Sequence, residues 1–82
     1  PARAPTRLSY KDQRELDLLP GEIEALNAEI ALHEESLANP ALYTRDPDGF
    51  MRISAALDAA RARLATCEDR WLELAEMSEA LG

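Results

Sequence analysis

The residues best suited to chemistry are four cations within the first fourteen positions. Arg3, Arg7, Lys11 and Arg14 face a single acidic residue there, Asp12. Such side chains bind phosphate through charge and hydrogen bonds and do not read base sequence. The other 68 residues carry five basic and 15 acidic side chains, and the whole chain has a net charge of −7. The uneven charge predicts one end that attracts a nucleic-acid backbone and a shaft that repels it.

Two further cations, Arg45 and Arg52, flank a predicted turn and form a second candidate for phosphate contact. A solvated turn would carry the same residues without binding anything, so both interpretations stay open. Arg63 and Arg70 lie on a predicted helix where glutamates of a facing helix would meet them. We therefore assign these two arginines to structure.

The sequence groups no residues for catalysis or metal binding. His33 is the only histidine, and no Cys or carboxylate lies at ligand spacing on its helix face. Cys67 is the only cysteine, and the three glycines form no phosphate-binding loop. We expect no enzyme activity, no metal and no cofactor in this fragment, with His33 serving as a polar seam residue that sets register.

Two apolar stripes with spacings of three and four predict the elements that position the cations. The first stripe is Leu16, Leu19, Ile23, Leu26, Ile30, His33 and Leu37. The second is Phe50, Ile53, Leu57, Ala60, Leu64, Cys67, Trp71, Leu74, Ser78 and Leu81. A proline-containing turn separates them, so the sequence predicts an all-α fold, an antiparallel two-helix coiled-coil hairpin.

A register in which facing residue numbers sum to 90 places Leu26 against Leu64 near the middle of the hairpin. The same register predicts two interhelical ion pairs, Glu22 with Arg70 and Glu29 with Arg63. Exposed pairs contribute only about 0.2 to 1 kcal/mol each, so they select the alignment more than they stabilise it.

Capping signals and prolines set the expected boundaries. We expect a linker at residues 1–7 and a helical domain at residues 8–82. Within the domain we expect helices at about 9–19, 20–39 and 48–81, with a turn at 40–47. Ser9 is a candidate N-cap, Pro20 should bend the chain, and Asp46 followed by Pro47 should start the last helix.

The last helix is the longest, so the short N-terminal helix should dock at the open end of the hairpin and cover it. Leu19 would then shield Trp71, and Tyr10 would lie in the core or be half-buried.

The longest uncharged run, residues 36–44, is nine residues and contains a proline. It is far too short for a membrane span, so we expect no membrane partner. A lone buried thiol fits a reducing compartment, and we expect a cytoplasmic location. The start at Pro1 and the lack of a catalytic pocket favour a piece of a longer protein.

Three segments carry a resemblance to a known family. They are LSYKDQREL at residues 8–16, LYTRDP at residues 42–47 and RWLEL at residues 70–74. In this order they resemble the C-terminal domain of Uup-type ABC-F ATPases, over about residues 8–77. The resemblance implies a cytoplasmic bacterial protein whose two cassettes bind ATP and Mg²⁺ and whose tail follows the second cassette. The motifs that bind ATP are not in this sequence.

In that family the tail is associated with nucleic-acid binding, DNA in particular, and with tuning of the ATPase, while the family at large works on ribosomes. Two hypotheses follow. The domain binds the DNA or RNA backbone through Arg3, Arg7, Lys11, Arg14, Arg45 and Arg52. Alternatively, it is a protein-interaction or spacer module that docks on the cassettes of its parent protein or on the ribosome.

Overall fold

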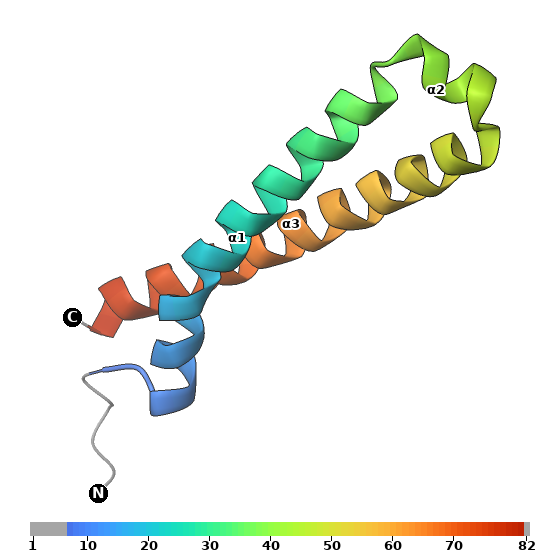
Figure 1. The fold of residues 1–82 in the computed structure, drawn as a ribbon. Coiled ribbons are helices and arrows are strands. Elements are labelled where there is room, and N and C mark those ends of the chain that lie inside the picture. Colours follow the sequence, from blue (N-terminus) through green and yellow to red (C-terminus); the bar gives the residue numbers. More distant parts are fainter. Residues whose placement is uncertain (1–6, 82) are drawn as a thin grey trace, which may run out of the picture.

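The computed structural model describes residues 7–81. Two long helices, α1 (Tyr10–Leu37) and α3 (Pro47–Leu81), lie side by side and antiparallel, and the short α2 (Pro40–Arg45) joins them at one tip (Figure 1). The molecule measures 68 × 16 × 16 Å. The predicted all-α helical hairpin is confirmed.

The predicted boundary at Pro20 is wrong, because α1 runs as one helix from Tyr10 to Leu37 with this proline inside it. Proline removes one helical hydrogen bond and crowds the preceding turn, which bends a helix. The ribbon of α1 does change direction in its N-terminal third (Figure 1). The apolar stripe continues on both sides of the bend, with Leu19 and Leu26 both buried, so packing keeps the helix continuous.

The expected turn at residues 40–47 contains a helix, α2. Asn39 caps it by accepting a hydrogen bond from the amide of Ala41 at 3.0 Å. Asp46 then starts α3, since its Oδ1 accepts a hydrogen bond from the amide of Gly49 at 2.9 Å. Gly49 is buried, and a Cβ there would collide with the Asp46 carboxylate, so a glycine permits this close approach.

The core consists of residues from the two predicted stripes. The buried members are Leu19, Leu26, Ile30, Leu57, Ala60, Cys67 and Leu74, and the partly buried ones packed against them are Leu16, Ile23, Leu37 and Leu64. Core membership is therefore confirmed for these residues, while other stripe members such as Trp71 lie outside this cluster and the layer-by-layer pairing remains a prediction. His33 is half-buried in its seam position, and its Nε2 lies 3.3 Å from Oε2 of Glu29 one turn earlier on the same helix. The expectation that no carboxylate lies on the helix face of His33 is therefore wrong.

The predicted shielding of Trp71 is wrong. Trp71 is 39% exposed and Tyr10 is 81% exposed, whereas Leu74 is completely buried. The first turns of α1 do cover the C-terminal third of α3, but they approach it over Arg70 and Leu74. Trp71 consequently lies at the margin of the contact.

Candidate nucleic-acid interface

The cations of the first fourteen residues are called the basic end here, and those that the structure describes lie around the start of α1. Arg7 precedes the helix, and Lys11 and Arg14 lie in its first turns; all three side chains are exposed. Arg3 lies outside the described residues. Ser9 fixes where the helix begins, because its hydroxyl accepts a hydrogen bond from the amide of Asp12 at 3.1 Å, as predicted for an N-cap.

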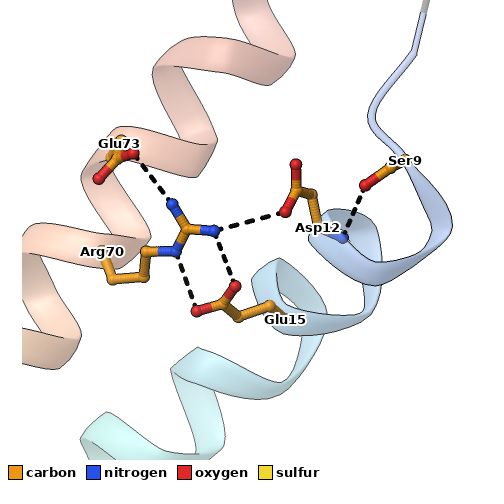
Figure 2. A network of polar contacts seen from close by, with 5 residues as sticks. All are labelled: Ser9, Asp12, Glu15, Arg70 and Glu73. Carbon is orange, nitrogen blue, oxygen red and sulfur yellow. Dashed lines mark hydrogen bonds and ion pairs between the residues drawn. The ribbon is translucent and has the colours of Figure 1, made fainter.

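Arg70 holds the acidic side chains next to this basic end (Figure 2). Its Nε and Nη2 donate to the two carboxylate oxygens of Glu15, each at 2.9 Å. Nη2 also donates to Oδ1 of Asp12 at 3.4 Å, and Nη1 donates to Oε1 of Glu73 at 3.0 Å. One guanidinium thus binds three carboxylates, two from α1 and one from α3, and joins the N-terminal turns of α1 to α3.

This geometry shifts the pKa values of both Glu15 and Arg70. The hydrogen bond from Arg70 is the main cause that lowers the pKa of Glu15 below its ordinary value of 4.5, with the charges of Arg70 and Lys11 adding to the effect and partial burial opposing it. The same hydrogen bond raises the pKa of Arg70. Both groups therefore remain ionised at neutral pH.

The predicted ion pairs were wrong by one heptad. Arg70 pairs with Glu15 instead of Glu22, and Arg63 pairs with Glu22 at 3.7 Å instead of Glu29. Both arginines keep the structural role assigned to them. Glu15, Glu22 and Glu29 are spaced seven residues apart on one helix face, so an alignment shifted by one heptad also brings a glutamate to each arginine.

The carboxylates of Asp12 and Glu15 face α3, which leaves the opposite side of α1 without them. At 100° per residue, Tyr10 lies roughly 140° or more around the helix from both acids, and Arg14 lies roughly 160° from Asp12 and roughly 100° from Glu15. Within residues 7–81, no acidic side chain forms an ion pair with Arg7, Lys11 or Arg14. The positive charge of the basic end is therefore open to an external anion.

The other two candidate cations lie at the tip, at the far end of the hairpin from the basic end (Figure 1). Arg45 and Arg52 are both exposed, and Nη2 of Arg52 lies 3.9 Å from Oδ2 of Asp46. The five candidates among the described residues consequently form two separate groups. At this tip the rings of Tyr43 and Phe50 pack edge to face, with their centroids 5.2 Å apart.

Sequence reasoning missed one exposed aromatic side chain, Tyr10, in the middle of the basic end. It lines a surface hollow together with Gln13, Arg14, Asp17 and Leu18. A signal for its exposure was present, because steps of three and four back from Leu16 reach residues 12 and 9 and skip residue 10.

The remaining titratable groups do not make a reactive centre in the described part of the chain. Cys67 is buried in the core, and burial, followed by the charge of Glu22, raises the pKa of its thiol. Among residues 7–81 no three His, Cys, Asp or Glu side chains are grouped to hold a metal ion. None of the helices described is both long enough and apolar enough to cross a bilayer.

Comparison with known families adds an independent observation. The family model for the ABC transporter C-terminal domain matches residues 7–76, which include α1, α2 and most of α3. The chain belongs to this family. The match covers the whole hairpin except the last turns of α3, so the family domain and the helical hairpin are the same unit.

Curated relatives place the domain more narrowly. The ATP-binding protein Uup of Caulobacter vibrioides is 52% identical over 92% of this chain. The Uup proteins of Haemophilus influenzae and Escherichia coli are 39% and 30% identical over 85% and 84% of it. The chain is thus a C-terminal domain of the Uup-type ABC-F ATPases, and it spans only 11–12% of the length of these relatives. No solved structure matches it significantly.

The three segments that carried the family resemblance have structural roles in this C-terminal domain. The segment at residues 8–16 holds the Ser9 cap and the two acids bound by Arg70. The segment at residues 42–47 ends with the Asp46 cap of α3. The segment at residues 70–74 supplies Arg70 and the fully buried Leu74. Together they set the ends of the helices and lock the open end of the hairpin.

Proposed function

We propose that this domain binds nucleic acid, DNA in particular, by contacting the phosphate backbone with its basic end. The observation that supports this most directly is that Arg7, Lys11 and Arg14 are exposed and unpaired in residues 7–81, while Arg70 holds the neighbouring acids. Cations arranged in this way contribute affinity and position without sequence preference. Arg3 adds a fourth charge to the same end of the sequence.

The parent protein, in this proposal, is a cytoplasmic ABC-F ATPase whose cassettes bind ATP and Mg²⁺. The named relatives are ATP-binding proteins and are about eight times longer than this chain. The family resemblance assigns nucleotide and Mg²⁺ to the cassettes of the parent. The domain then supplies a nucleic-acid contact to the larger enzyme.

A fourfold substitution tests the binding proposal. Changing Arg3, Arg7, Lys11 and Arg14 to Gln should abolish binding to a short DNA duplex at low salt and leave the helical content intact, because Arg7, Lys11 and Arg14 do not belong to the core and Arg3 precedes them in the sequence. The matched control changes Arg45 and Arg52 to Gln at the other end of the hairpin. If the control loses binding and the fourfold variant keeps it, the site lies at the tip instead.

A second candidate function, docking on the parent cassettes or the ribosome, is supported by apolar side chains on α3. Trp71, Leu72 and Met77 are all exposed in the last third of this helix. Large exposed apolar side chains in one part of a helix favour protein contacts. Apolar docking depends little on salt, whereas phosphate binding weakens steeply as salt rises, so binding at two salt concentrations separates the two functions.

A further inference from the structure

Tyr10 is the most exposed of the large apolar side chains in the described part of the chain, at 81%. A tyrosine ring has a large apolar face, and such rings are usually at least half covered in a folded domain. Here the contacts with α3 are made by neighbouring residues of the same segment, such as Asp12 and Glu15, and Leu8 is buried instead. The hairpin therefore does not use the ring of Tyr10 for its own stability.

The surroundings of this ring are cationic and partly apolar. Arg14 lies one turn further along the same helix face, and Leu18 lies one turn beyond Arg14, also exposed. Arg7 and Lys11 flank the ring in the sequence on either side. An exposed aromatic face among unpaired cations is the combination that binds single-stranded nucleic acid, with phosphates on the cations and bases stacked on the ring.

We infer that Tyr10 is a stacking platform for an unpaired base of a DNA strand whose phosphates lie on Arg7, Lys11 and Arg14. This inference rests on the nucleic-acid binding proposed above and adds a preference for single strands or frayed ends over intact duplex. Bases in a duplex are already stacked on one another and cannot offer a free face to the ring.

One acidic side chain limits this surface. Asp17 lines the same hollow as Tyr10 and Arg14, and its Oδ1 accepts a hydrogen bond from Nε2 of Gln13 at 2.9 Å. Its charge repels a phosphate at this position. Asp17→Asn keeps an acceptor for Gln13, removes the charge, and should strengthen binding to single strands.

The tip offers a weaker version of the same combination. Tyr43 is 61% exposed there, but its ring packs edge-on against Phe50, and Arg52 is close to the Asp46 carboxylate. The tyrosine at the tip is thus partly occupied by its own domain. This makes Tyr43 the matched control for Tyr10.

The test compares an oligo-dT strand with a blunt duplex of the same length, using the 82-residue chain. Tyr10→Leu should weaken binding to the strand about 5- to 100-fold and change duplex binding less than about twofold. Tyr10→Phe should retain strand binding because it keeps the ring, and Tyr43→Leu should bind as the parent does. Circular dichroism should show unchanged helicity in all three variants.

The outcomes separate the two levels of the proposal. Equal binding of oligo-dT by Tyr10→Leu and the parent chain would overturn the stacking role and leave the phosphate contact standing. An equal loss toward strand and duplex would also overturn it, because stacking requires an unpaired base. Failure of the parent chain to bind either probe at low salt would overturn the nucleic-acid function and the stacking role with it.

Discussion

Arg70 and Glu15 form a bidentate ion pair across the open end of the hairpin, with both N···O distances at 2.9 Å. This pair fixes the helix bearing the basic end against α3 and neutralises an acid one residue from Arg14 (Figure 2). The same contact therefore serves the stability of the hairpin and the electrostatics of its candidate binding surface.

Loss of Arg70 should lower the melting temperature more than loss of Glu15 alone. Arg70→Gln leaves the carboxylates of Asp12, Glu15 and Glu73 close together without their cation, and like charges repel. The melting temperatures are measured by circular dichroism during thermal unfolding. A double-mutant cycle of Arg70→Gln and Glu15→Gln should give a clear coupling energy, and strictly additive effects would contradict the pair.

The same cluster should make the hairpin acid-sensitive. The pKa of Glu15 is lowered in the folded chain, so its contribution to stability is complete above the ordinary value of 4.5 and is lost as pH falls through the lower folded value. The urea midpoint should drop between pH 5 and more acidic solutions, and Glu15→Gln should drop less. If the urea midpoints of the two proteins fell equally with pH, the ion pair of Glu15 would not be the cause of the acid sensitivity.

Leu74 should be the most sensitive apolar residue of the C-terminal third of α3. It is fully buried, and Leu74→Ala should cost about 2 to 5 kcal/mol, a large part of the stability of a small domain. Leu72→Ala is the matched control, since Leu72 is exposed two residues away and should change stability by no more than about 0.5 kcal/mol. Denaturant unfolding of both variants decides whether α1 packs over this part of α3.

The cap at the tip should be measurable separately. Asp46→Ala removes the acceptor for the Gly49 amide and should destabilise the chain by about 1 kcal/mol, whereas Asp46→Asn should cost less because it keeps an acceptor. Urea midpoints of the two variants give the comparison. Similar losses for both would assign the effect to the charge at the helix N-terminus instead.

The core and the caps were predictable from the sequence because they depend on local rules. Apolar spacing identified the buried stripes, and Ser9 and Asp46 were found as caps from their positions before helical segments. The ion-pair partners were not predictable, since Glu15, Glu22 and Glu29 share one helix face and two alignments one heptad apart both pair the arginines with glutamates. The exposure of Trp71 depends on the side from which the first turns of α1 approach α3, which apolar spacing does not specify.

The candidate binding surface was predictable in charge but not in detail. The excess of cations before residue 15 could be counted directly. That Asp12 and Glu15 bind Arg70 could not be predicted, because Arg70 lies 55 residues further along the chain from Glu15 and only the fold brings them together. The separation of Arg45 and Arg52 from the basic end could be predicted, because the expected hairpin placed them beside its turn and placed the first helix at its open end.

The salt dependence of duplex DNA binding tests the central proposal most directly. If the basic end contacts phosphates, the logarithm of affinity should fall linearly with the logarithm of salt concentration, with a slope of about −0.9 for each contact. Four cations at this end predict a slope no steeper than about −3.6, and each of the changes Lys11→Gln and Arg14→Gln should make it shallower by about 0.9. A slope near zero, or one unchanged by both substitutions, would contradict phosphate binding at this end of the domain.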